Sequence, residues 1–253
     1  MDRVVHRWIV DNFLLDLYVP SFIYHSYACL QGRGTLRAVK AVQKGMKHCK
    51  QIWGEYYVLK MDVRKYFQSI DKDILYNIIT RKIKDEKLLW LIREIIYSSP
   101  SKKGVAIGNY TSQIFANIYL NELDQYIKRK LKVKYYYRYM DDSIVLAKTK
   151  EEAKYILAEI TKFLKEKLEL ELNSKTQIFK NKQGVNFCGY KINEYRLKIR
   201  DRGKKQLKKK IKYLKYEIKK GRMSSSDAQK YLCGHLGYIR YANVYNLTNK
   251  LFY

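Results

Sequence analysis

Two adjacent acidic residues, Asp141 and Asp142, stand between two strand-like segments in the middle of the chain. The residues on both sides of Tyr139-Met-Asp-Asp142 are rich in aromatic and β-branched types, which predicts two strands joined by a tight turn. Two carboxylates at the tip of an apolar hairpin offer the oxygen ligands that a hard divalent cation such as Mg²⁺ prefers. Asp-Asp is also ordinary turn chemistry, so the tetrapeptide alone leaves a plain turn and a metal site both open.

A third carboxylate, Asp62, lies near the end of the strand-like segment 56–63. Two Mg²⁺ ions need several oxygen ligands and must keep open positions for substrate phosphates. In two-metal phosphoryl transfer the ions lie about 3.5–4 Å apart; one activates the attacking hydroxyl and the other stabilises the leaving pyrophosphate. Asp62 on one strand and the acidic pair on a neighbouring hairpin predict such a site, with Mn²⁺ able to replace Mg²⁺.

The composition indicates a polyanionic partner. The chain of 253 residues has 52 Lys and Arg against 24 Asp and Glu, a formal charge of +28, together with 25 Tyr. Cations mixed with aromatic rings suit unpaired nucleic acid; the alternative is a basic protein from an AT-rich genome. The four Cys and four His are scattered without the spacing of a zinc site, which favours reduced thiols. No apolar run is long enough to span a bilayer and no leader is apparent, so a cytoplasmic protein without membrane contact is expected.

The periodicity predicts an α+β fold, an antiparallel sheet with helices on one face. A helix that begins near Thr111 or Ser112 precedes the acidic hairpin, and the capping box of Thr149 and Glu152 starts the helix that follows it. Two very basic helices are expected from about residue 203, the second capped by Ser226. Further helices are expected at residues 35–47, 71–82 and 85–97, and strands at 56–63, 135–139, 143–147, 170–175 and 185–192.

Read together, these segments resemble the motifs of reverse transcriptases, in the same order over nearly the whole chain. Leu59-Lys-Met-Asp-Val-Arg-Lys-Tyr-Phe67 is similar to the first catalytic motif of that family, and residues 139–142 are similar to the second. Asn186-Phe-Cys-Gly-Tyr-Lys191 resembles the primer-grip hairpin, with Cys188 where Leu is more usual. The segment Leu172-Asn-Ser-Lys-Thr176 resembles the one before it, which makes Lys175 the candidate for protonating the pyrophosphate.

A narrower resemblance comes from Ile107-Gly-Asn-Tyr-Thr-Ser-Gln113. Most reverse transcriptases have Gln where Ile107 stands and Pro where Gln113 stands. The form seen here is similar to that of diversity-generating retroelements, whose enzymes copy a template-repeat RNA with errors at adenines. Residues 231–243 resemble the thumb of that group. Residues 3–6 and 31–37 resemble finger motifs shared with group II intron and retron enzymes, and an N-terminal finger extension is expected to be short or missing.

The resemblance implies roles for single residues. Asp62, Asp141, Asp142 and the backbone carbonyl of Val63 are the expected metal ligands, although Asp142 could instead hold the turn. Phe67 is the expected steric gate against ribonucleotides, or else a core aromatic, and Tyr66 is expected in the core. The residues expected around the incoming nucleotide are Ile107, Gly108 and Gln113, and Arg33 and Arg37 are candidates for its triphosphate, or else solvated surface.

The expected architecture is a right-hand polymerase, with fingers at residues 1–55 and 81–107, a ferredoxin-like palm at 56–80 and 108–196, and a helical basic thumb at 197–253. The expected activity is error-prone RNA-directed DNA synthesis by two-metal chemistry, with RNA template, cDNA or primer, and dNTPs as substrates. The resemblance also implies a small basic accessory protein that forms an oligomeric ring. The alternatives are a retron or group II-like reverse transcriptase and a non-catalytic RNA-binding scaffold.

Overall fold

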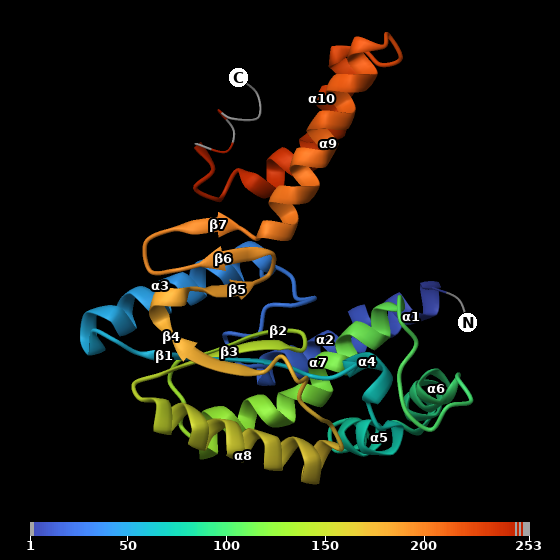
Figure 1. The fold of residues 1–253 in the computed structure, drawn as a ribbon. Coiled ribbons are helices and arrows are strands. Elements are labelled where there is room, and N and C mark those ends of the chain that lie inside the picture. The colour runs from blue at the N-terminus through green and yellow to red at the C-terminus, as the bar shows by residue number, and fades with distance from the viewer. Residues whose placement is uncertain (1–2, 246, 248, 250–253) are drawn as a thin grey trace.

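Two antiparallel sheets form the frame of the molecule. The computed structural model describes residues 3–245, 247 and 249 (Figure 1). The larger sheet has the strand order β2-β3-β1-β4, and the smaller one has the order β5-β6-β7. The strands are β1 (Tyr57–Asp62), β2 (Tyr136–Tyr139), β3 (Asp142–Ala147), β4 (Gln177–Lys180), β5 (Val185–Phe187), β6 (Tyr190–Ile192) and β7 (Leu197–Ile199).

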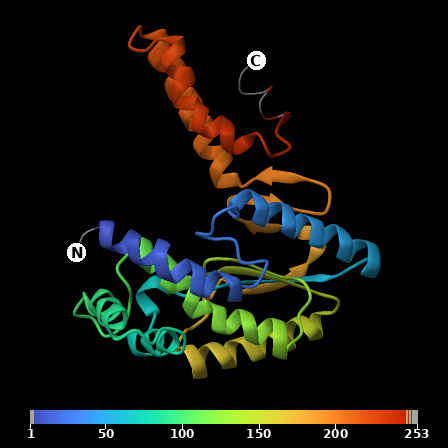
Figure 2. The same cartoon turned by 180° about the vertical axis from the view of Figure 1, so that it is seen from behind.

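Helices cover both faces of the larger sheet (Figures 1 and 2). Helices α7 (Tyr110–Gln125) and α8 (Lys150–Leu168) lie on one face, and α3 (Thr35–Trp53) lies on the other beside the smaller sheet. The expectation of helices on one face only was therefore wrong. The reason is visible in β1, where the neighbours Val58 and Leu59 point to opposite faces and are both fully buried, in two different apolar clusters.

The remaining helices surround this frame, and α9 and α10 project away from it as a pair (Figure 1). The first helix is tied to α7 by a buried hydrogen bond of 2.8 Å between His6 Nδ1 and Thr111 Oγ1. These helices are α1 (Arg3–Ile9), η1 (Val10–Leu14), α2 (Leu15–Tyr18), η2 (Val19–Ser21), α4 (Tyr66–Ser69), α5 (Lys72–Thr80), α6 (Glu86–Tyr97), η3 (Tyr126–Lys130), η4 (Asn181–Gln183), α9 (Asp201–Lys219) and α10 (Ser225–Ile239).

The helices expected from residues 35, 71 and 85 begin within one residue of those positions, whereas only one of the three predicted capping sites is confirmed. Thr149 caps α8 as predicted, since its hydroxyl accepts from the Glu152 amide at 3.1 Å. Helix α7 has Asn109 at its N-cap rather than Thr111 or Ser112, and the Thr111 hydroxyl instead bonds to His6. At α10, Ser224 rather than Ser226 accepts the amide hydrogen bond, from Asp227 at 3.1 Å.

The predicted strand at residues 170–175 is a turn in the structure. Asn173 Oδ1 accepts from the Lys175 amide at 3.1 Å, and the Asn173 carbonyl accepts from the Thr176 amide at 2.9 Å. Leu172 pairs with Val63 only in an isolated bridge, the local bonding of Asn173 then turns the chain, and the strand begins at Gln177 as β4. Over the described residues, no helix is both long and apolar enough to cross a bilayer.

Candidate active site

The pairing of β1 with β3 brings the three acidic residues together. In this register Asp62 lies directly opposite Asp142. Asp141 precedes Asp142 in the turn, and the Asp62 carboxyl lies near enough to raise the pKa of the Asp141 carboxyl. Asp62 and the acidic pair, about 80 residues apart in the sequence, thus share one end of the sheet, as the sequence predicted.

Burial and mutual repulsion raise the pKa values of two of these carboxyl groups. The pKa of Asp141 rises to about 6, chiefly through burial and also through the neighbouring Asp62. The pKa of Asp142 also rises to about 6 through burial, with Lys60 acting in the opposite direction. Holding all three groups ionised is therefore costly unless a cation compensates them.

The unsatisfied oxygen of Asp142 agrees with such a cation. Asp142 Oδ1 is buried and has no hydrogen-bond partner. Among the described residues, three His, Cys, Asp or Glu side chains do not converge as a ready-made metal cage. Mg²⁺ is usually bound by one or two carboxylates and completed by substrate phosphates and water, so the residues present fit that kind of site.

Val63 continues from β1 and pairs with Leu172 in an isolated antiparallel bridge. The Asp62 carbonyl accepts from the Asn173 amide at 2.7 Å, and the Arg64 amide donates to Glu171 at 2.9 Å. These two bonds flank Val63 and do not use its carbonyl, which keeps the predicted backbone ligand compatible with the geometry.

Asp62 and Asp142 line a cavity of about 430 Å³ that four cations also line. Lys60 Nζ lies 3.4 Å from Asp142 Oδ2 and donates to the Asn186 carbonyl at 2.7 Å, so it joins the acidic end of the sheet to the β5–β6 hairpin. The hairpin turns at Cys188 and Gly189, both with positive φ. The other cations that line the cavity are Lys175, Lys191 and Arg200.

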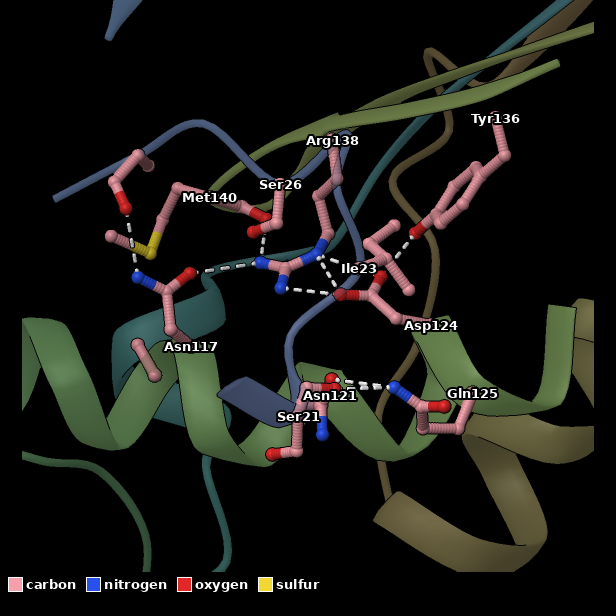
Figure 3. A network of polar contacts seen from close by, with 12 residues as sticks. Ser21, Ile23, Ser26, Asn117, Asn121, Asp124, Gln125, Tyr136, Arg138 and Met140 are labelled. Atoms are coloured by element: carbon pink, nitrogen blue, oxygen red, sulfur yellow. Dashed lines mark hydrogen bonds and ion pairs between the residues drawn. The ribbon is translucent and has the colours of Figure 1, made fainter. Parts of the chain in front are cut away.

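A buried ion pair supports the acidic turn from beneath (Figure 3). Arg138 is 1 % exposed, and its Nη2 lies 2.6 Å from Asp124 Oδ2. The guanidinium also donates to Asn117 Oδ1 at 3.1 Å and to the Met140 carbonyl at 3.0 Å. The Tyr136 hydroxyl donates to Asp124 at 2.8 Å. One network therefore links α7, β2 and the turn that carries Asp141.

The segment before α7 lies against the predicted gate residue. The Val105 amide donates to the Phe67 carbonyl at 2.9 Å, which brings the chain before Ile107 beside Phe67. Phe67 is half-buried, whereas Tyr66 is in the core, as expected, and donates from its hydroxyl to Ala116 at 2.5 Å. Ile107 is 73 % exposed, so it does not pack against the core.

The other predicted nucleotide-binding residues lie in different places. Gly108 precedes α7 with φ +100° and lines a separate cavity near His6, and Gln113 is half-buried in α7. Arg33 donates to the carbonyls of Ile23 and Ser26, at 2.9 and 2.6 Å. Arg33 and Arg37 line a cavity that shares no residue with the carboxylate cavity. The structure thus does not bring these two arginines to the carboxylates.

The sequence as a whole matches the family described as "Reverse transcriptase (RNA-dependent DNA polymerase)" over residues 2–192. The chain belongs to the reverse transcriptase family. The range of the match includes Asp62, Asp141, Asp142 and the β5–β6 hairpin.

Curated relatives of this reverse transcriptase include intron-encoded proteins. Group II intron-encoded protein LtrA of Lactococcus lactis is 24 % identical over 76 % of this chain and 43 % of its own length. Protein YkfC of Escherichia coli is 24 % identical over 76 % of this chain and 60 % of its own. The putative COX1/OXI3 intron 2 protein of Saccharomyces cerevisiae is 23 % identical over 70 % and 28 %. The chain thus spans less than two thirds of these relatives.

The fold is shared with solved polymerases. The apo telomerase of Candida tropicalis, truncated from its C-terminal domain, superimposes with a TM-score of 0.60 at 14 % identity, covering 78 % of this chain and 45 % of that one. The telomerase of Candida albicans with a telomeric RNA fragment gives 0.57 at 14 % identity, over 78 % and 37 %. These likenesses agree with the α+β right-hand polymerase predicted for this reverse transcriptase.

Sequence reasoning missed three features of this reverse transcriptase: Lys60, Asn173 and the Arg138–Asp124 pair. Lys60 could have been found, because a strand places residues two apart on the same face and Lys60 is two before Asp62. Asn173 Nδ2 lies 3.4 Å from Asp62 Oδ2. No local sequence pattern predicts the Asn173–Asp62 contact or the Arg138–Asp124 ion pair, since each joins residues from different elements.

Proposed function

We propose that this reverse transcriptase synthesises DNA on an RNA template, with its polymerase centre at Asp62, Asp141 and Asp142. The observation that carries this proposal is the register that sets Asp62 opposite Asp142, beside a cavity lined by four cations. Carboxylates on rigid strands can hold cations, and the lysines and the arginine around them suit the phosphates of a primer strand.

Two Mg²⁺ or Mn²⁺ ions would be held by the three carboxylates and the Val63 carbonyl. They would lower the pKa of the attacking hydroxyl and stabilise the negative charge of the leaving pyrophosphate. The protein itself positions these ligands through the β1–β3 pairing and through the bond from Arg138 to the turn. Lys175 is exposed at the cavity wall, and in this proposal it would give a proton to the leaving pyrophosphate. Phe67 excludes the ribose 2′-hydroxyl, and Ile107 and Gln113 face the nascent base pair.

The division into fingers (1–55 and 81–107), palm (56–80 and 108–196) and thumb (197–253) belongs to the same proposal. It is supported by the position of the acidic end of the sheet in the middle part of the chain and by the projecting pair α9 and α10 (Figure 1). Helix α9 is rich in lysine, which suits contact with a template–primer backbone. Residues 246, 248 and 250–253 of this proposed thumb lie outside the described residues.

We assign the enzyme to the diversity-generating subclass on the segment from Ile107 to Gln113, and with it propose adenine-specific errors on a template-repeat RNA and a ring-forming basic accessory protein. The similarity to LtrA favours a second candidate, a group II-like enzyme. The error spectrum of the cDNA separates the two, because only the first predicts errors concentrated opposite template adenines.

A primer-extension assay with Mg²⁺ on a generic RNA template tests the polymerase proposal. Asp62→Ala and Asp141→Ala are expected to abolish extension, because these carboxylates hold the metal ions. RNA binding, measured by anisotropy, is expected to stay within about twofold, well below the tenfold change that about 1.4 kcal/mol would give. Wild-type incorporation by either variant would disprove the two-metal assignment. Absence of extension by the wild type with intact RNA binding would favour a non-catalytic scaffold.

A further inference from the structure

A second cavity, of about 510 Å³, lies along α3 and the edge strand β2. This volume is within the range of roughly 300–1,000 Å³ that is usual for small-ligand sites. Tyr135 lines it and precedes Tyr139 by four residues, which at about 3.3 Å per residue places this wall roughly 13 Å along the strand from the acidic turn. The cavity is thus separate from the polymerase centre.

The walls carry positive charge that no acidic residue balances. Arg33, Arg37, Lys44 and Lys134 all line the cavity, and its lining contains no Asp or Glu. Arg33 and Arg37 donate to backbone carbonyls, which orient the guanidinium groups without neutralising them. None of the four cations forms an ion pair with a carboxylate in the part of the chain that the structure describes. Four such charges around one hollow make it an anion site.

Aromatic rings stand among these cations. Tyr24 is 78 % exposed and its ring lies 5.0 Å from that of His25, which in turn lies 4.7 Å from the ring of Tyr137. Burial lowers the pKa of His25 to about 4, so this imidazole is neutral at physiological pH. Exposed and half-buried rings of this kind are stacking partners for a base.

Two details show that the hollow is part of the fold. Gly45 is buried on α3, and a Cβ there would overlap the Tyr137 hydroxyl, so the missing side chain gives that ring its place in the wall. The Tyr135 hydroxyl is buried and has no hydrogen-bond partner, although the residue lines the cavity. An unsatisfied hydroxyl in a wall otherwise built from rings and cations is open to a polar ligand after a small shift of its neighbours.

We propose that this cavity binds an unpaired nucleotide of an RNA strand, outside the polymerase centre. Lys44, Lys134 and Arg37 contact its phosphates, and the base stacks in the Tyr24–His25 wall. An acidic peptide would use the cations and leave the rings idle, so the combination favours nucleic acid. That this strand is the template rests on the proposed polymerase function, whereas binding at the site itself depends on neither metal ions nor the catalytic carboxylates.

Binding of a fluorescent oligouridylate of eight nucleotides, measured by anisotropy without divalent metal over a range of salt concentrations, tests this site. The double variant Lys44→Ala/Lys134→Ala is compared with Lys47→Ala/Lys130→Ala. Lys47 is exposed on α3, as Lys44 is, and Lys130 is exposed at the end of η3, four residues before Lys134; neither lines the cavity. Both pairs lower the formal charge from +28 to +26, because each removes two lysines.

The cavity variant is expected to lower the slope of log affinity against log salt by about 1.4, since each neutralised phosphate of a single strand contributes about 0.7. The matched control is expected to keep the wild-type slope. Equal slopes for the two variants would overturn the proposal, because the binding would then come from general charge.

Photocrosslinking identifies the strand and the ring. An octamer with one 4-thiouridine is expected to crosslink to Tyr24 or Tyr135, and Tyr24→Ala is expected to weaken binding severalfold without changing the salt slope, because stacking carries no charge. If free uridine monophosphate, at the same concentration as the octamer, protected these residues from crosslinking, the cavity would be assigned to a free nucleotide. If oligothymidylate protected these residues from crosslinking equally well, the cavity would be assigned to DNA. If a glutamate decapeptide competed equally well with the RNA octamer, the cavity would be only a surface for anions. Each of these three outcomes contradicts the proposal.

Discussion

Arg138 donates from Nη1 to the carbonyl of Met140 at 3.0 Å, across the turn that carries Asp141. Met140 has φ +57°, a left-handed conformation that non-glycine residues adopt at some cost. The donor is held in turn by the buried ion pair with Asp124 (Figure 3). The direction in which the acidic turn faces is therefore set by a charge pair in the core as well as by the turn itself.

Loss of one partner of that pair is expected to destabilise the protein strongly. Asp124→Ala leaves the Arg138 guanidinium buried without a counter-charge, and breaking a buried pair in this way costs about 3–5 kcal/mol of unfolding free energy. Urea denaturation followed by circular dichroism measures the loss. Glu55→Ala, which removes an exposed partner of Lys180 and Lys182, is the control and is expected to change stability far less. Similar losses for both variants would show that the network does not stabilise the fold.

Replacement of the gate ring is expected to admit ribonucleotides. Phe67→Ala removes the bulk that would meet a 2′-hydroxyl, so the preference for dNTP over rNTP should fall by about tenfold or more, or about 1.4 kcal/mol of discrimination. Single-nucleotide incorporation with each substrate measures the ratio of kcat/KM values. Phe67→Tyr keeps the ring and should keep the selectivity. An unchanged ratio in Phe67→Ala would leave Phe67 as an ordinary half-buried aromatic.

A polar side chain at position 107 is expected to improve fidelity. Ile107 is exposed beside the Phe67 segment and can offer shape but no hydrogen bond, whereas Gln has both a donor and an acceptor. Ile107→Gln should lower misincorporation opposite template adenine by about tenfold for each 1.4 kcal/mol of added discrimination. Sequencing of the cDNA measures the error rate, with Ile107→Val as the apolar control. Equal error rates in the wild type and Ile107→Gln would show that Ile107 does not set fidelity.

Stability is expected to fall on acidification, in part through His25. Burial first, then the charges of Lys128 and Arg33, lower the pKa of His25 from 6.5 to about 4 in the folded protein. The unfolded chain therefore binds more protons between these values, so the contribution of His25 is complete above pH 6.5 and is lost as pH falls towards 4. Urea denaturation of the wild type and His25→Gln across this window measures the difference. Parallel pH profiles would contradict the assignment.

The strands around the acidic residues were predictable because their pattern is local. Residues 56–63 and 143–147 are dense in β-branched and aromatic residues, and β1 and β3 form there within one residue of the expected bounds. The segment at 170–175 has a similar apolar alternation, but Asn173 bonds to the backbone that follows it and turns the chain. An alternation of apolar and polar residues does not reveal whether a side chain will bond to the nearby backbone and so compete with strand pairing.

The acidic residues were predictable for a different reason, since their spacing and their flanking residues match a family motif. Their supporting network was not, because Arg138 in a run of tyrosines gives no sign that it is buried or that its partner is Asp124 on another element. The positions of Arg33 and Arg37 could not be predicted from the sequence either. Arg33 is held by carbonyls of a loop whose path depends on an isolated parallel bridge between Ser26 and Arg138.

The pairing of Asp62 with Asp142 also limits how the gene can change length. Side chains alternate between the faces of a strand, so one inserted or deleted residue within β1 would turn Asp62 to the opposite face and exchange the two apolar clusters at once. Chain length can vary more freely between helices, as in the link from α5 to α6, where no strand register has to be kept. We therefore expect related sequences to keep the length of β1 and to carry their insertions elsewhere.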